Sequence, residues 1–374
     1  EPGSMGATIC DPHTEDILLI LAHLIDLEKQ GIPVPWERVR VVSFGEIGSN
    51  HFPVAANMLH AASTESANID RIAEMCEEVV LNAFDSSSLS QSVTNLKRAF
   101  QALLITGDQS SLLDVVRLFK HSNDGNRLRQ AALKATKQHN AVIYDAIKTL
   151  HDEIQTTKKD KQVNAIDTRL APLLSNKSMQ RFFCREGNYF DQIPDFLANG
   201  DLVLIDFKGA AKEMYRLCAG WLTNLYFHAS QDRGTGGRPH LLVFDEVQKF
   251  SATEAFFRIL TENRKFNLGL ILMTQEAEAL EPKLKSSIKQ NAGMIMSVRQ
   301  SGDGAKAMAE LLGDPFSSDE LANLEKGKEA AIRSFEGKAR LLLDYPAYVW
   351  DGKDAARGSA EEREAKEAAK EKMM

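Results

Sequence analysis

One stretch, Pro239 to Phe250, constrains the fold more than any other part of the sequence. Its apolar run, Leu241 to Phe244, shows no polar alternation and ends directly in two carboxylates, Asp245 and Glu246. Four apolar residues without alternation are typical of a strand that is buried on both faces of a parallel sheet. Residues at the carboxyl ends of such strands lie where open α/β sheets bind their ligands. The stretch therefore predicts an α/β fold with a ligand site at this sheet edge.

Two adjacent acids at a strand end suit the hydrolysis of a nucleoside triphosphate. Asp245 would hold a Mg²⁺-bound water, and Glu246 would orient and polarise the attacking water. The alternative is a strand that simply ends in two solvated acids. The remainder of the chain has to decide between these interpretations.

Composition limits the number of domains, the kind of surface and the cellular compartment that the chain can have. The 374 residues are enough for two or three domains at about 150 residues each. The net charge of −7 excludes a surface that is basic all over, but it permits a local basic stripe. The four cysteines form no CxxC pair, which predicts reduced thiols in a cytoplasmic protein. No apolar run approaches the roughly 20 residues of a membrane span, so we expect any membrane attachment to come from a partner or another segment. Residues 1–4 resemble a cloning remnant.

Hydrophobic spacing divides the chain into four regions, 1–56, 57–199, 200–350 and 351–374. The first region reads as strand, helix and strand at residues 6–13, 16–30 and 38–44, which is one βαβ unit. The second carries helical periodicity throughout and predicts an all-α insertion. The third returns to the α/β pattern, and the fourth is a charged tail. Helices of the insertion are expected at residues 69–84, 90–104, 111–119, 126–152 and 162–174.

The third region alternates buried-type strands with helices. Strands are expected at residues 200–207, 239–244, 268–274 and 292–298, and helices at 211–230 and 252–264. Residues 329–335 and 339–343 are expected to pair as a hairpin.

Polar side chains follow four of the predicted strands. The residues are Asp11 with His13, Asp206 with Lys208, Asp245 with Glu246, and Gln275. Because parallel strands end at one edge of a sheet, these groups are expected to face a common ligand. The Gln275 amide would sense a γ-phosphate or position water there, and the alternative is that it only caps its strand.

The order of these motifs resembles the HerA–FtsK superfamily of RecA-like, ring-forming P-loop ATPases. The resemblance rests on Thr-Ile-Cys-Asp-Pro-His, Leu-Val-Leu-Ile-Asp, Leu-Leu-Val-Phe-Asp-Glu and Leu-Ile-Leu-Met-Thr-Gln, in that order around a helical insertion. Within the superfamily the chain looks like the conjugation and type IV secretion branch, the TraG-like coupling proteins. The implied fold is a RecA-like, mainly parallel sheet with helices on both faces, interrupted by the all-α insertion.

The resemblance also implies roles for individual residues. Asp245 and Glu246 match the Walker B pair, with Asp245 as the metal ligand, and Gln275 matches the polar sensor. Arg264 and Arg299 are candidates for an arginine finger that acts on a neighbouring subunit, or for surface salt bridges. Asp11 and His13 match the family's Asp-Pro-His strand end and would shape the cofactor site. The implied cofactors are ATP and Mg²⁺, and the implied partners are DNA and the other subunits of a hexameric ring.

The chain departs from the family in one respect. It contains no Gly-x-x-x-x-Gly-Lys-Ser/Thr loop, the Walker A motif that cradles phosphates. The strand that feeds this loop normally lies inside the sheet, so its loss would leave inner strands with unpaired edges. We expect this chain to be the C-terminal piece of a longer protein. The alternatives are a strand supplied by a separate polypeptide or a swapped neighbour, and a chain that has lost nucleotide binding and kept the fold for assembly.

Three functions follow from these observations. The first is the C-terminal motor portion of a DNA-translocating ATPase of conjugation or type IV secretion, a DNA-dependent ATPase whose hydrolysis drives DNA transfer. The second is a non-catalytic interaction module in which the helical insertion docks a substrate protein or a relaxase. The third is a HerA-like motor that works with a nuclease.

Overall fold

The computed structural model describes residues 5–44, 54–60, 65–83, 92–107, 110–157, 170, 175–250 and 254–342. The tail predicted at 351–374 lies outside these residues, and so does the helix predicted at 162–174 apart from residue 170. None of the described helices is long and apolar enough to cross a membrane.

A five-stranded parallel sheet forms the centre of the α/β part, in the order β2-β3-β1-β4-β5. The α/β class predicted from the sequence is therefore confirmed. Every neighbouring pair in this sheet runs parallel. The strands are β1 (Gly6–Asp11), β2 (Val39–Ser43), β3 (Leu202–Asp206), β4 (His240–Phe244) and β5 (Leu268–Leu272).

The predicted βαβ unit is present, but its two strands are not neighbours. β3 lies between β1 and β2, although it follows them by more than 150 residues in the sequence. Tertiary packing determines which distant strands pair. Hydrophobic spacing along the chain does not reveal this order.

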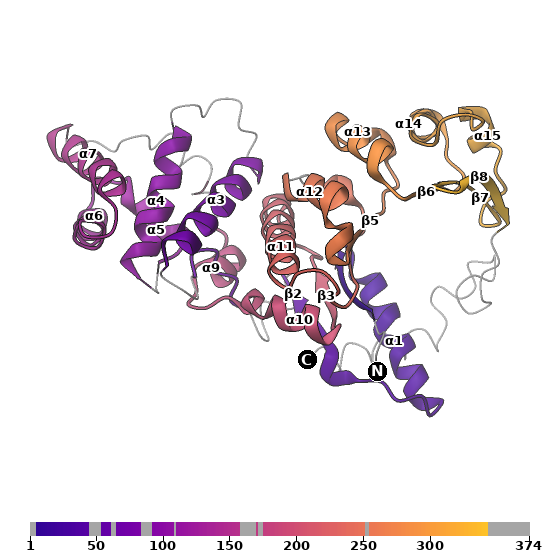
Figure 1. The fold of residues 1–374 in the computed structure, drawn as a ribbon, viewed down its shortest axis with the longest axis horizontal. Coiled ribbons are helices and arrows are strands. Elements are labelled where there is room, and N and C mark those ends of the chain that lie inside the picture. Colours follow the sequence, from indigo (N-terminus) through magenta and orange to yellow (C-terminus); the bar gives the residue numbers. More distant parts are fainter. Residues whose placement is uncertain are drawn as a thin grey trace.

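Helices cover the two faces of this sheet differently (Figure 1). On the first face, α1 (Glu15–Lys29) packs Ile17, Leu18 and Leu21 against Leu204 of β3. On the second face, α11 (Lys212–Asp232) and α12 (Glu254–Glu262) contribute to the main hydrophobic core. The strand side chains therefore alternate between two cores, as a sheet with helices on both sides requires.

The helical part lies to one side of the sheet in Figure 1, and its core is continuous with that of the second face. Its helix α3 packs along α11. The prediction of one helix over residues 126–152 was wrong, because α6 ends at Thr136 and α7 begins at Ala141. The Asn140 side chain accepts hydrogen bonds from the backbone N–H groups of Val142 and Ile143 at 3.0 and 3.2 Å, and this cap starts the second helix. The helices are α3 (Ser66–Ala83), α4 (Ser92–Thr106), α5 (Leu112–Leu118), α6 (Asn123–Thr136), α7 (Ala141–Thr157), α9 (Lys177–Phe183) and α10 (Ile193–Asn199).

The C-terminal part adds a separate antiparallel sheet, in the order β6-β7-β8. The predicted hairpin is confirmed, because β7 (Glu329–Ser334) pairs with β8 (Gly337–Leu342). The strand predicted at 292–298 is β6 (Met294–Ser297), which pairs with β7. Sequence reasoning missed the helices around it, α13 (Pro282–Asn291), α14 (Gly302–Leu312) and α15 (Ser318–Ala322).

Arg129 on α6 is an unusual structural residue, because its side chain is completely buried. It donates hydrogen bonds to the carbonyl oxygens of Leu118 and Lys120 at 2.7 and 2.9 Å, at the end of α5. Arg129→Met should lower the free energy of unfolding by about 2–4 kcal/mol, since two buried carbonyls lose a charged donor. Urea unfolding measures this loss. Arg127→Met on the same helix is the control and should change stability by less than about 0.5 kcal/mol, because its side chain is 84% exposed. Equal effects of the two changes would contradict the role of Arg129.

His240 at the start of β4 should make the protein sensitive to acid. It is fully buried, with Nε2 2.9 Å from Thr8 Oγ1 and its ring stacked on Tyr226. Burial, with a smaller contribution from Arg233, lowers the pKa of His240 to about 3. The unfolded chain, with an ordinary histidine pKa of about 6.5, takes up the proton first as the pH falls.

The stability that neutral His240 contributes is therefore complete above about pH 6.5 and declines as the pH approaches 3. Between pH 6.5 and 5 the expected loss is about 2 kcal/mol, measured by urea unfolding at each pH. His240→Gln should flatten this dependence. An unchanged pH dependence in the variant would disprove the assignment.

Candidate functional site

The carboxyl ends of the parallel strands bring the predicted site residues to one edge of the sheet. The register aligns Asp11 with Asp206, Cys10 with Phe244, and Phe244 with Leu272. Asp245 and Glu246 follow Phe244 directly, and Gln275 follows β5 by three residues. Asp11 and Asp206 therefore lie at the same edge as the Asp245–Glu246 pair.

Two of these acids hold the surrounding backbone. Asp11 is buried, and its carboxylate accepts from the backbone N–H groups of His13, Asp16 and Ile17 at 2.6, 3.1 and 3.3 Å. These bonds satisfy donors in the first turn of α1. The geometry gives Asp11 a positioning role at the start of α1, and its contact with a cofactor stays a prediction.

Asp206 fixes a second part of the same edge. Its buried carboxylate accepts hydrogen bonds from Ser43 Oγ at 2.7 Å, from the Lys208 backbone N–H at 2.9 Å, and from Thr14 Oγ1. The side chain thereby ties β2, β3 and the β1–α1 loop together. Thr14 itself has a left-handed φ of 68°, which is uncommon for a β-branched residue.

Asp245 lies in an acidic setting that suits a cation. Its side chain is half-buried, and its carboxylate also interacts with the Glu246 backbone N–H. Burial raises the pKa of Asp245, and the nearby carboxylates of Asp16, Asp11 and Glu246 raise it further. A bound divalent cation would offset this repulsion.

The donor set at this edge suits a particular kind of metal. Within the described ranges no group of three or more histidine, cysteine or acidic side chains could hold a metal ion. Mg²⁺ at a nucleotide site is ordinarily held by one or two carboxylates together with waters and phosphates. Asp245 as a single protein ligand fits that pattern and does not fit a metal held by the protein alone.

Glu246 is held in a strained conformation by three side chains. Its φ of 49° and ψ of 54° lie in the left-handed region, and backbone strain of this kind is concentrated at functional sites. Its Oε2 atom lies 3.1 Å from His13 Nε2 and forms an ion pair with Lys249 Nζ, while Oε1 lies 3.5 Å from Gln275 Nε2. Burial raises the pKa of Glu246, but hydrogen bonds from Lys249 and His13 lower it more, so the net pKa is below its ordinary value. Glu246 is therefore a carboxylate at neutral pH.

The structure adds residues that sequence reasoning missed. Lys249 lies one turn after Glu246 and is also 3.0 Å from His13 Nε2, so it joins both groups. Thr274 Oγ1 donates to Gln248 Oε1 at 2.7 Å, which links the segment after β5 to the segment after β4. The i,i+3 spacing of Glu246 and Lys249 was the available signal for the first contact.

One of the two candidate arginine fingers, Arg264, lies away from this cluster within one chain. Arg264 belongs to the 3₁₀ turn Asn263–Phe266, which precedes β5 and so lies at the opposite edge of the sheet. Its guanidinium lies over the Phe335 ring at 5.9 Å from the centroid. Arg299 is exposed and follows β6. Arg264 could therefore reach an Asp245–Glu246 pair only on another subunit.

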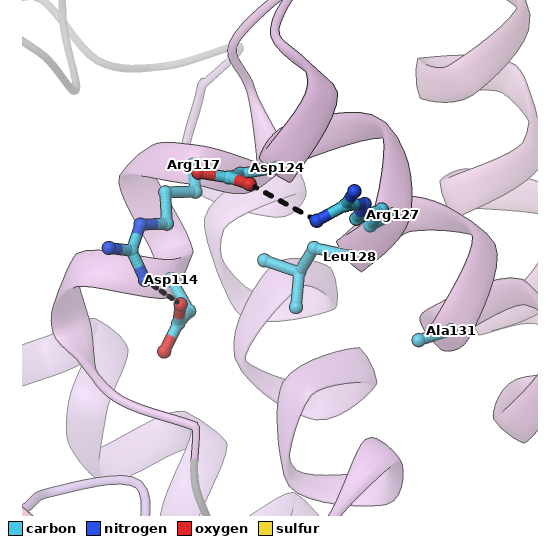
Figure 2. Close-up of a pocket in the computed structure, with 6 residues that line it drawn as sticks. All are labelled: Asp114, Arg117, Asp124, Arg127, Leu128 and Ala131. Carbon is cyan, nitrogen blue, oxygen red and sulfur yellow. Dashed lines mark hydrogen bonds and ion pairs between the residues drawn. The ribbon is translucent and has the colours of Figure 1, made fainter.

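A hollow of about 330 Å³ lies elsewhere, on α5 and α6 of the helical part (Figure 2). Its charged residues pair within their own helices, Arg117 with Asp114 at 2.9 Å and Arg127 with Asp124 at 4.0 Å. Each pair joins one positive and one negative charge, and none of the predicted site residues lines the hollow. It is therefore separate from the site at the sheet edge.

Comparisons with known proteins support the fold. Neither a protein-family model nor a curated protein sequence matches the chain. Among solved structures, the bacterial conjugative coupling protein TrwBdeltaN70 aligns with 91% of this chain and 85% of its own, at a TM-score of 0.50 and 13% identity. The plasmid coupling protein TrwB, in complex with the non-hydrolysable ATP analogue ADPNP, aligns with 91% of this chain and 78% of its own, at a TM-score of 0.56 and 10% identity. VirB4 of Thermoanaerobacter pseudethanolicus aligns with 92% of this chain and 83% of its own, at a TM-score of 0.50 and 13% identity.

At these identities the likeness shows the fold. It agrees with the RecA-like fold that the sequence motifs imply. The roles of single residues stay predictions.

Proposed function

We propose that this chain is the C-terminal motor portion of an ATPase that moves DNA in conjugation or type IV secretion. The observation that carries the proposal is the Asp245–Glu246 pair at the carboxyl edge of a parallel sheet, with Glu246 held by His13, Lys249 and Gln275. The fold shared with coupling proteins that bind nucleotide analogues supports it.

Side chains of this chain are suited to separate roles in ATP hydrolysis. Mg²⁺ would neutralise charge on the phosphates, with Asp245 as its carboxylate contact. Glu246 Oε2 is engaged by Lys249 and His13, so Oε1, which faces the Gln275 amide, is the oxygen available to polarise a water. Gln275 is exposed at the same edge and can donate to a phosphate or to that water.

Arg264 or Arg299 would act from a neighbouring subunit of a ring, and within one chain Arg264 lies at the sheet edge opposite to the pair. A guanidinium supplied in this way stabilises charge in the transition state of phosphoryl transfer. DNA is the proposed polymer substrate, with a relaxase or a secretion-channel protein as a further partner, and the proposed location is the cytoplasm, at the inner face of the membrane through such a partner.

Calorimetric titration with a non-hydrolysable ATP analogue and Mg²⁺ tests the proposal. Micromolar binding by this chain, or by a longer form that restores the residues before Met5, is the expected result. Binding by neither form would contradict it. The second candidate, an interaction module without nucleotide binding, would then be favoured, because the sequence contains no Walker A loop. Loss of relaxase binding after deletion of residues 57–199 would support that module.

A further inference from the structure

One carboxylate oxygen of Glu246 has two nitrogen partners that also contact each other. Its Oε2 atom contacts His13 Nε2 at 3.1 Å and the ammonium of Lys249, and these two nitrogen atoms lie 3.0 Å apart. The three atoms form a triangle, which we call the Glu246 triangle. Two nitrogen atoms therefore converge on a single oxygen of the residue that is proposed to act on water.

The 3₁₀ turn that follows Glu246 creates the contact with Lys249. This turn, η3 (Val247–Lys249), begins after the left-handed Glu246, and the Lys249 backbone N–H donates to the Glu246 carbonyl oxygen at 2.9 Å. Side chains three residues apart lie above one another in such a turn. The lysine side chain is thereby directed back over the carboxylate, while His13 reaches the same oxygen from the loop after β1.

The hydrogen atoms of the Glu246 triangle cannot satisfy all three contacts. If His13 Nε2 carries a hydrogen atom, it donates to Glu246 Oε2, but its N–H then also faces the Lys249 ammonium, which can only donate. If Nε2 carries none, it accepts from Lys249, but its lone pair then faces a carboxylate oxygen, which can only accept. One contact is therefore unfavourable in either arrangement. Moving the lysine to another partner relieves this conflict, which lowers the cost of breaking its ion pair.

The members of the triangle differ in their exposure to solvent. The Glu246 side chain is 12% exposed, whereas those of Lys249 and His13 are 36% and 51% exposed. The ion pair of Glu325 with Lys328 has the same i,i+3 spacing, but both of its side chains are more than half exposed. Such a surface pair contributes little to stability. In the Glu246 triangle the carboxylate is enclosed, so the lysine and the histidine are the members with room to move away.

The position of the Lys249 ammonium affects what Glu246 can do. An ammonium on Oε2 offsets part of the negative charge with which the carboxylate attracts a water proton. A general base must lie within about 2.6–3.2 Å of the water that it deprotonates, and that water lies about 3–3.5 Å from the phosphorus it attacks. Because Lys249 contacts the same carboxylate, the terminal phosphate is the phosphate group closest to its ammonium. Lysine binds phosphate as a point charge, so a long side chain in this position is suited to that contact.

We propose that Lys249 exchanges Glu246 for the terminal phosphate of a nucleoside triphosphate. In the nucleotide-free protein its ammonium holds Glu246 Oε2. When a triphosphate binds, the ammonium pairs with the terminal phosphate, and the carboxylate is then free to act on water. A nucleoside diphosphate has no group at this position and leaves Lys249 on Glu246. The exchange thereby reserves the full negative charge of Glu246 for the triphosphate-bound state. This inference rests on the proposed function.

Acetylation of lysine side chains by acetic anhydride, measured by mass spectrometry, tests the exchange without measuring activity. In the 374-residue chain without nucleotide, Lys249 should react about 3-fold faster in Glu246→Gln than in the wild type, because it has lost its ion pair. In the form that binds the non-hydrolysable ATP analogue, the analogue with Mg²⁺ should slow this reaction in Glu246→Gln, and ADP with Mg²⁺ should not.

Lys328 is the control for the labelling, because it forms an i,i+3 ion pair elsewhere and should react at the same rate with and without nucleotide. Unchanged labelling of Lys249 in Glu246→Gln would overturn the proposal, since no ion pair would then restrain the ammonium. Equal protection of Lys249 by the analogue and by ADP, or protection by neither, would also overturn it.

Calorimetric titration of Lys249→Met provides a second measurement. The variant should bind the ATP analogue more weakly than the wild type but bind ADP equally well, so the ratio of the two affinities should fall about 5-fold or more. Lys328→Met should leave this ratio unchanged. Binding of the analogue with an unchanged ratio in Lys249→Met would overturn the exchange and leave the proposed function standing. Absence of analogue binding in every form would refute the proposed function and the exchange together.

Discussion

Glu246→Gln should abolish ATP hydrolysis and leave nucleotide binding intact. Glutamine keeps the shape of the side chain, but its amide cannot accept a proton from the attacking water. We expect a loss of about 100-fold or more in the hydrolysis rate, measured as Mg²⁺-dependent phosphate release in the form that binds the ATP analogue. The melting temperature should change little, because the ion pairs with His13 and Lys249 are partly exposed.

The control for this change is Glu276→Gln, an exposed acid close to the same edge. It should keep full hydrolysis, since only its backbone N–H bonds to the site, through Thr274 Oγ1 at 3.0 Å. Full residual activity of Glu246→Gln would disprove the assignment of Glu246. Loss of analogue binding in that variant would show that Glu246 acts in binding and not in the chemical step.

Asp206→Ala should be among the most destabilising single changes at this edge of the sheet. The substitution leaves the hydroxyl groups of buried Thr14 and half-buried Ser43 without the carboxylate that now accepts from them. Because hydrogen bonds to a charged group stabilise by about 1.5–3 kcal/mol, we expect the free energy of unfolding to fall by about 2–4 kcal/mol. Urea unfolding at neutral pH measures this change.

Two further variants define what Asp206 does. Asp206→Asn keeps an acceptor oxygen and should lose less stability than the alanine variant. Asp303→Ala, at a carboxylate on the exposed first turn of α14, should be close to neutral. If Asp206→Ala were as mild as Asp303→Ala, the carboxylate would not hold β2, β3 and the β1–α1 loop together.

Local patterns in the sequence determined which elements form. The unbroken apolar runs that end in Asp206 and Asp245 predicted two buried parallel strands, because only a strand covered on both faces needs no polar alternation. Helical periodicity predicted most of the helices between residues 66 and 157. It failed at residues 137–140, where the Asn140 cap divides one periodic stretch into two helices. At such a cap a side-chain oxygen replaces a backbone carbonyl as the hydrogen-bond acceptor of backbone N–H groups. Hydrophobic spacing does not detect this replacement.

In the candidate site, too, the sequence predicted some features and missed others. Strand ends alone predicted that Asp11, Asp206, Asp245 and Gln275 would share one edge of a sheet, since parallel strands all end on the same side. The ion pairs of Glu246 with His13 and Lys249 depend on the left-handed turn at Glu246, which the residue types do not reveal.

The tertiary structure alone decided which strands are neighbours and which surfaces remain uncovered. Strand order follows from pairing across long sequence separations, as in the insertion of β3 between β1 and β2, and such contacts leave no periodic signal in the chain. The sequence by itself determined the α/β class and the acidic pair at a strand end, because both arise from residues close together in the chain. The open edge of β5 and the exposed Ile271 and Met273 became visible only in the assembled sheet, because exposure is a property of what packs against a residue.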